Sequence, residues 1–199
     1  MAVPPTSALP EVDIYLHVRV LMGMIVGLAL THLLRHAARI VEHPKQTGIY
    51  WVHLVWAFSM FLFLLHFWWW EFRLASLQQW SFNLYMFVVI YALLLYLLCA
   101  LIFPEQIAGY KDYRDYYYSR RAWFFGTLAV MYIIDYADTW VKGPTYLRSF
   151  GTEYAIRNGT YIVLSLVAIC TRRPRFHELF AVAGVIYQLS WIAREFETL

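Results

Sequence analysis

The sequence predicts an all-α polytopic membrane protein, a bundle of six transmembrane helices that forms a single unit over residues 1–199. Three observations predict this fold class. Apolar residues make up 61% of the chain and charged residues only 15%, whereas soluble domains average about 50% and 25%. Apolar segments recur along the chain at lengths that suit membrane helices. Lysine and arginine gather in alternate connections between these segments.

The predicted spans follow from segment length, since a helix needs about 20 mostly apolar residues to cross the hydrocarbon core of a bilayer. Three segments meet this length easily, and three later ones are shorter or carry charges near their ends. The six predicted spans are 15–34, 49–70, 80–103, 123–136, 154–170 and 176–192.

The predicted orientation rests on where the basic residues fall. Cytoplasmic loops of membrane proteins carry an excess of Lys and Arg. Ten of them lie in the first, third and fifth connections, against four in the second and fourth connections and at the C-terminal end. The ten are Arg35, Arg39, Lys45, Lys111, Arg114, Arg120, Arg121, Arg172, Arg173 and Arg175. We therefore expect both termini to lie outside, in a protein of the bacterial inner (plasma) membrane type.

The N-terminal stretch MAVPPTSALPEVDI has no Lys or Arg. A secretory signal peptide begins with a basic region, so we expect the first apolar run to remain in the membrane as a signal anchor.

Aromatic residues mark two expected interfaces with lipid headgroups. Trp68, Trp69 and Trp70 end the second span, where indole rings favour the headgroup level. Residues 110–121 alternate charges with tyrosines, which predicts an interfacial helix suited to anionic lipid rather than to nucleic acid. We therefore expect the protein to contact the lipid bilayer directly.

The two halves, 14–103 and 108–199, show short similarities that favour two inverted three-helix repeats. One of these matches pairs Tyr50-x-x-His53 with Tyr154-x-x-Arg157. Inverted repeats are typical of transporters, whose sites lie near the membrane midplane. This association favours transport without establishing it.

Ionisable residues inside a bilayer are costly and therefore indicate sites. We expect an ion or proton pathway on the outer half, formed by His66, Asp135, Arg157, Glu71 and Arg19. His17, Asp138 and Glu153 belong to the same outer set. In the alternative interpretation these groups are interhelix ion pairs and span ends.

Histidines on the inner half offer a second kind of site. His32, His36 and His53 are expected at a similar depth, where three imidazoles can hold a transition metal or two can hold haem. The alternative is that these histidines contact lipid headgroups.

A stripe of small residues, Gly23, Gly27 and Thr31, lies at four-residue spacing in the first span. Such a stripe lets another helix approach closely, within the chain, in a homo-oligomer or in a partner membrane subunit.

No catalytic motif accompanies these features: the sequence holds no Gly-rich phosphate loop, no His-Glu-x-x-His and no Gly-x-Ser-x-Gly. We therefore lean against an enzyme. The leading hypothesis is a small transporter or channel for an ion, a proton or a small polar solute. The alternatives are an accessory subunit of a membrane complex and a histidine-ligated haem or metal redox protein.

Overall fold

The computed structural model describes residues 11–43, 48–76, 80–107 and 109–195, and every regular element in them is helical. The all-α prediction is therefore confirmed for the described part of the chain. The expectation about residues 1–10, and the share of Lys45 in the charge pattern, lie outside the described residues.

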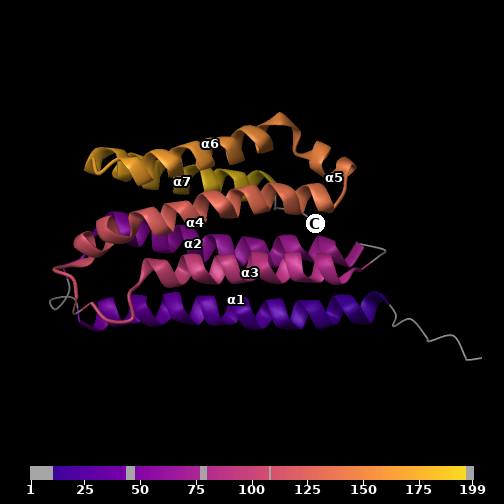
Figure 1. Cartoon of the computed structure of the whole chain (residues 1–199), viewed down its shortest axis with the longest axis horizontal. Coiled ribbons are helices and arrows are strands. Elements are labelled where there is room, and N and C mark those ends of the chain that lie inside the picture. The colour runs from indigo at the N-terminus through magenta and orange to yellow at the C-terminus, as the bar shows by residue number, and fades with distance from the viewer. Residues whose placement is uncertain (1–10, 44–47, 77–79, 108, 196–199) are drawn as a thin grey trace, which may run out of the picture.

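Six long helices lie side by side along one axis, as Figure 1 shows, and two short elements complete the described chain. The long helices are α1 (Glu11–Glu42), α2 (Trp51–Trp70), α3 (Phe82–Ile102), α4 (Tyr113–Val141), α6 (Gly151–Cys170) and α7 (Pro174–Glu195). The short elements are the 3₁₀ helix η1 (Glu71–Ser76) and α5 (Pro144–Ser149).

Local sequence explains where several helices begin. Ser81 caps α3 by accepting the Leu84 N–H, and Asp112 caps α4 by accepting the Asp115 N–H at 2.7 Å. Gly143 and Gly151 flank α5 with φ of 119° and 62°. These left-handed conformations suit glycine, and they allow the tight reversal between α4 and α6.

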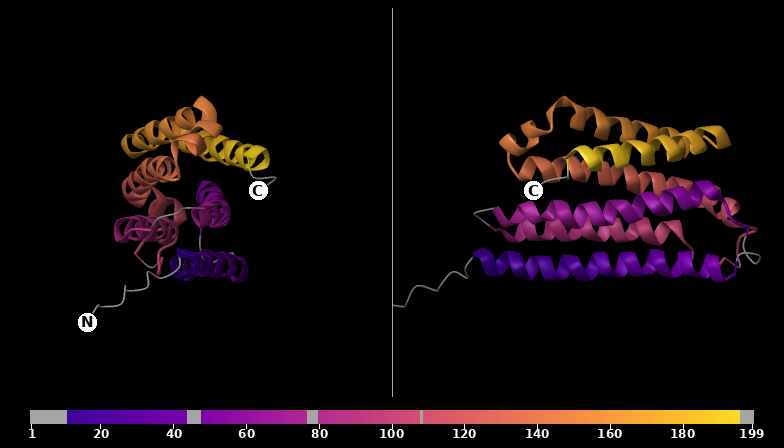
Figure 2. Two further views of the ribbon diagram at one scale, coloured as in Figure 1. Left: turned by 90° about the vertical axis from the view of Figure 1, so that its right-hand side faces the viewer. Right: turned by 180° about the vertical axis from the view of Figure 1, so that it is seen from behind.

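The centre of the bundle is α2, which packs against α1, α3, α4 and α7. The end-on view in Figure 2 places α1 on one side of the bundle and α6 with α7 on the opposite side. In the first half each long helix packs against the other two. In the second half α7 packs mainly on α2 and meets α6 only in part, so the two halves are packed differently.

Within the described residues, four helical segments are long and apolar enough to cross a membrane, which indicates an integral membrane protein. They are Ile14–Glu42, Trp51–Ala75, Phe82–Ile102 and Pro174–Arg194. The helices α4 and α6 fall outside this set because charged residues lower their hydropathy.

Two interfacial predictions need correction. Residues 113–121 do not form a separate surface helix, because α4 runs without a break from Tyr113 to Val141 and buries Tyr116 and Tyr117. The three tryptophans also differ from one another. Trp69 is exposed as an interfacial ring would be, whereas Trp70 is buried against Phe150 with ring centroids 5.0 Å apart.

Candidate functional site: a buried charged network

The carboxylate of Asp135, buried in α4, accepts hydrogen bonds from two other helices. Its Oδ1 accepts the Tyr91 hydroxyl of α3 at 2.9 Å. Its Oδ2 lies 3.1 Å from Arg157 Nη2, 3.0 Å from Asn158 Nδ2 and 2.9 Å from the Tyr154 hydroxyl, all on α6. Charge-assisted bonds of this kind are the strong ones, so Asp135 joins α3, α4 and α6.

A second cluster lies around Lys142, at the end of α4. Its ammonium donates to Glu71 Oε1 at 2.9 Å and to Asp138 Oδ2 at 2.6 Å. All three side chains are at most 2% exposed. The Trp70 ring lies 5.4 Å from the Lys142 nitrogen and so adds a cation–π contact. Glu71 Oε2 has no hydrogen-bond partner among the described residues.

Aromatic rings surround the guanidinium of Arg157. The Trp191 centroid lies 4.8 Å from its central carbon, Tyr154 lies at 5.1 Å and Tyr132 at 5.8 Å. A guanidinium is weakly hydrated and stacks well on rings, which lets Arg157 stay charged although it is only 6% exposed.

We call these five charged groups the charged network: Glu71, Asp135, Asp138, Lys142 and Arg157. It holds three carboxylates and two cations, so the network carries one negative charge in excess when every group is ionised. An unbalanced buried charge costs several kcal/mol. A proton or a nearby cation would balance this charge.

The structure brings together most of the residues predicted for the outer pathway. Glu71, Asp135 and Arg157 belong to the network, and His66 lines a small cavity beside Arg157. Arg19 instead stacks over the rings of Trp68 and Phe72 at 5.4 and 5.0 Å. Their role as a pathway stays a prediction.

Sequence reasoning missed several members of the site. Lys142 lies in the predicted connection between the spans at 123–136 and 154–170, and its burial follows only from the fold. Tyr91 and Tyr154 look like ordinary apolar span residues in the sequence. The position of Asp138 one turn before Lys142 is the one local signal that predicts their ion pair.

Two cavities of about 10 Å³ each lie along the bundle interior. That volume is close to the least that holds one water molecule. One cavity lies beside His66 and Arg157, and the other lies beside His53 and Trp56. Between them the Trp56 ring packs edge-on against Phe124, Phe125 and Phe180, with centroids 5.0 to 5.5 Å apart. We call these four rings the aromatic plug.

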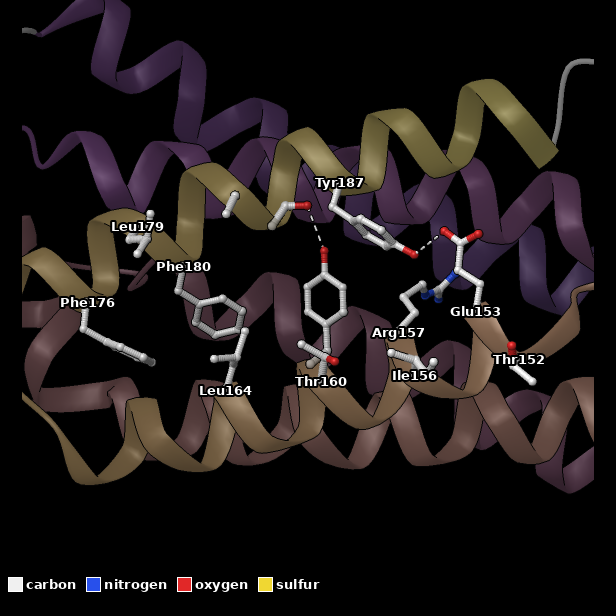
Figure 3. A pocket seen from close by; sticks show the side chains of 13 residues that line it. Thr152, Glu153, Ile156, Arg157, Thr160, Leu164, Phe176, Leu179, Phe180 and Tyr187 are labelled. Carbon is white, nitrogen blue, oxygen red and sulfur yellow. Dashed lines mark hydrogen bonds between the residues drawn. The ribbon is translucent and has the colours of Figure 1, made fainter.

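A longer groove of about 650 Å³ lies between α6 and α7, as Figure 3 shows. Most of its wall is apolar. At one end Arg194 holds Glu153 at 2.6 and 3.0 Å, and the Tyr187 hydroxyl donates to Glu153 at 2.9 Å. Hydrogen bonds from Arg194 and then from Tyr187 lower the pKa of Glu153 to about 2. Arg157 lines this groove as well as the small cavity.

Histidines at the other end of the bundle contact carbonyls and rings. His53 bonds the Ile102 carbonyl, and His36 bonds the His32 carbonyl at 2.9 Å. The Phe103 ring packs against both His36 and His53, with centroids at 5.2 and 4.7 Å. No three metal-ligating side chains among the described residues lie close enough to share an ion. The haem or metal hypothesis stays a prediction that these contacts do not favour.

The small-residue stripe divides between two environments. A Cβ on Gly23 would lie 2.9 Å from the Trp68 ring, so Gly23 allows α2 to approach α1. Gly27 has open space around it and Thr31 is exposed. The second part of the stripe therefore faces outwards.

No known protein family, curated protein or solved structure matches this chain. Its function must therefore be argued from the site.

Proposed function

We propose that the chain is an integral membrane transporter for a small polar solute or an ion, and that a proton binds and leaves at the charged network during its cycle. The observation that supports this proposal is the buried excess of carboxylates over cations. Asp135 has four donors and is the carboxylate best suited to remain ionised. Lys142 lies between two others, of which one needs a proton.

Glu71 is the carboxylate that we assign to this proton. Its Oε2 accepts no hydrogen bond among the described residues, whereas Oε1 accepts the Lys142 ammonium. A proton on Oε2 leaves Lys142 paired with Asp138 and makes the network neutral. Protonating a buried carboxylate costs less than leaving its charge unbalanced in the membrane.

The proposal takes all six long helices as spans. The buried charges of α4 and α6, which are Asp135, Asp138 and Arg157, turn inwards to the network, while apolar residues on the outward faces of both helices are exposed. These exposed residues are Trp123, Val130 and Ile133 on α4 and Ile156, Val163 and Leu166 on α6. With the alternating basic connections, six spans put both termini and the network outside. Inverted repeats are compatible with this count but are not required by it.

A solute path from the network past His66 towards His32 and His53 crosses the aromatic plug. Trp56 and Phe124 line the small cavity beside His53, and none of the four rings lines the small cavity beside His66 and Arg157. The described conformation is therefore closed along this path, and transport requires the rings to separate. Gating of this kind is an ordinary part of transport cycles.

Proton flux into liposomes tests the proposal. The purified protein is reconstituted with a pH-sensitive dye inside, and a potassium diffusion potential drives proton entry. We expect flux well above empty liposomes and at least a tenfold loss in Glu71→Gln. Glu105→Gln, which changes an exposed acid at the histidine end, should behave as the parent protein. Parent flux equal to that of empty liposomes, or full flux in Glu71→Gln, would overturn the proposal.

We also infer that a second subunit, either a further copy or another membrane protein, packs on the outward part of the stripe at Gly27 and Thr31. Open space around Gly27 supports this inference. Gly27→Leu should lower the particle mass in detergent while leaving the fold intact. Gly23→Leu should instead destabilise each copy, because it meets Trp68. An unchanged mass in Gly27→Leu would contradict the inference.

A further inference from the structure

The groove between α6 and α7 is too narrow for another helix. It follows α6 from Thr152 to Leu164, a rise of about 18 Å at 1.5 Å per residue. Its volume of about 650 Å³ spread over that length leaves a mean cross-section of about 36 Å². A helix with side chains is about 10 Å across and needs roughly twice that area. A single hydrocarbon chain is the better fit.

The floor and walls of the groove are built for an apolar occupant. Tyr161 crosses the floor and donates its hydroxyl to the Gly184 carbonyl at 2.8 Å, which closes the base between the two helices. Figure 3 shows Leu164, Phe180 and Phe176 along the wall beyond it. Since the Tyr161 hydroxyl and the Gly184 carbonyl bond each other, a molecule in the groove would contact mainly apolar side chains.

The groove leads at its Phe176 end to a basic surface. Phe176 and Leu179 also line a neighbouring hollow, together with Arg173, Pro174 and Arg175. Both arginines are exposed, and neither takes part in an ion pair among the described residues. Guanidinium groups bind phosphate oxygens with two parallel hydrogen bonds.

We propose that α6 and α7 form a binding site for an anionic phospholipid, whose phosphate lies between Arg173 and Arg175 and one of whose acyl chains fills the groove. Half of a hydrocarbon core of about 30 Å is about 15 Å, which the groove accommodates. Basic pockets beside membrane helices on the cytoplasmic side are typical sites for anionic lipids. This inference rests on the membrane location of the chain and not on proton binding at the network.

Native mass spectrometry of the full chain tests the site. The protein in neutral detergent receives equal amounts of phosphatidylglycerol and phosphatidylcholine with identical acyl chains, and the retained lipid is counted. We expect one retained lipid per chain with a preference for phosphatidylglycerol. Arg173→Gln with Arg175→Gln should reduce that preference by roughly tenfold, as expected for two arginine contacts with an anionic headgroup.

Matched variants separate this site from general surface charge. Arg35→Gln with Arg39→Gln removes two arginines from the same end of the bundle and should leave the preference unchanged. Ala183→Phe fills the groove and should abolish retention of both lipids, whereas Ala193→Phe, on α7 outside the groove, should not. Since Ala183→Phe leaves the arginines in place, it tests the groove even if the arginine variant is poorly folded.

Several outcomes would overturn the proposal. They are the absence of any headgroup preference, an equal loss in the Arg35 and Arg39 variant, and unchanged retention in Ala183→Phe. Glycerol phosphate, which has no acyl chain, should not displace the lipid at equal concentration. If it does, the site is one for a free anion. If Ala183→Phe lowers the particle mass by one chain, the groove instead holds a second copy.

Discussion

The two ends of the helix bundle bury ionisable side chains in opposite ways. At the network end, charged groups pair with one another across α4, α6 and the start of η1. At the histidine end, imidazoles bond carbonyls and pack on rings, as His53 does with Ile102 and Phe103. A neutral imidazole needs no balancing ion even where one ring nitrogen has no hydrogen-bond partner among the described residues, as for His53 Nδ1, whereas an unbalanced buried charge does. The comparison therefore favours the network end over the histidine end for the proton binding that we propose.

The largest loss of stability is expected when the carboxylate of Asp135, the partner of Arg157, is removed. Asp135→Ala leaves Arg157 buried without its carboxylate, and arginine cannot shed its charge. We expect the free energy of unfolding in detergent to fall by about 3–5 kcal/mol. Asp115→Ala, an exposed acid in the first turn of the same helix, should cost no more than about 1 kcal/mol. Equal losses in both variants would contradict the role of Asp135.

A smaller loss is expected from Lys142→Met. This change leaves the Asp138 carboxylate without its cation, but that carboxyl can take up a proton, which limits the loss to about 2–3 kcal/mol. Adding Asp138→Asn should restore part of the stability, because it removes the carboxylate that Lys142 neutralises. Chemical unfolding of the single and double variants measures this coupling. Losses that simply add would show that these groups do not act together.

The histidine end should respond less. His177 bonds the Tyr117 hydroxyl at 2.9 Å and the Thr171 carbonyl at 3.0 Å. His177→Phe should therefore cost about 1–2 kcal/mol, the range for buried neutral hydrogen bonds. A double-mutant cycle with Tyr117→Phe isolates the shared bond. A loss as large as that of Asp135→Ala would remove the contrast between the two ends.

The smallest effect is expected at the exposed pair of Glu153 and Arg194. The pKa of Glu153 lies at about 2 because Arg194 and Tyr187 stabilise its charged form. Because this pKa is lowered, the pair contributes its stability at pH values above the ordinary pKa of a carboxyl group. That contribution is lost as the pH falls towards 2. Solvent screens this pair, so Glu153→Gln should leave the thermal midpoint at pH 6 unchanged. A clear drop in the thermal midpoint at pH 6 would show that this exposed pair stabilises the protein as the buried network does, which would contradict the account.

Much of the fold could be predicted from the sequence because long apolar runs report directly on helix length. The runs at 15–34, 49–70 and 80–103 correspond to α1, α2 and α3. The limits of α4 could not be predicted in the same way. Its first turns are rich in tyrosine and charge, which also suits a surface helix, and only packing against other helices shows that Tyr116 and Tyr117 are buried.

The sequence predicts the charged residues of the candidate site that lie near span ends, but not its tyrosine and lysine donors. Glu71, Asp135 and Arg157 are conspicuous because charge is rare near predicted spans. Tyr91 and Tyr154 are two of 16 tyrosines, and nothing in the sequence separates them from rings that only pack. Lys142 follows the end of a helix, where a lysine is normally solvated. Its burial depends on how Glu71 and Trp70 meet it in three dimensions.

Infrared spectroscopy of the detergent-purified protein at neutral pH tests the central claim most directly. A protonated carboxyl group that is buried gives a carbonyl stretching band distinct from that of ionised carboxylates. The account predicts one such band in the parent protein and its loss in Glu71→Gln, with no loss in Glu105→Gln. A parent spectrum without the band, or a band that survives in Glu71→Gln, would contradict a proton held on Glu71.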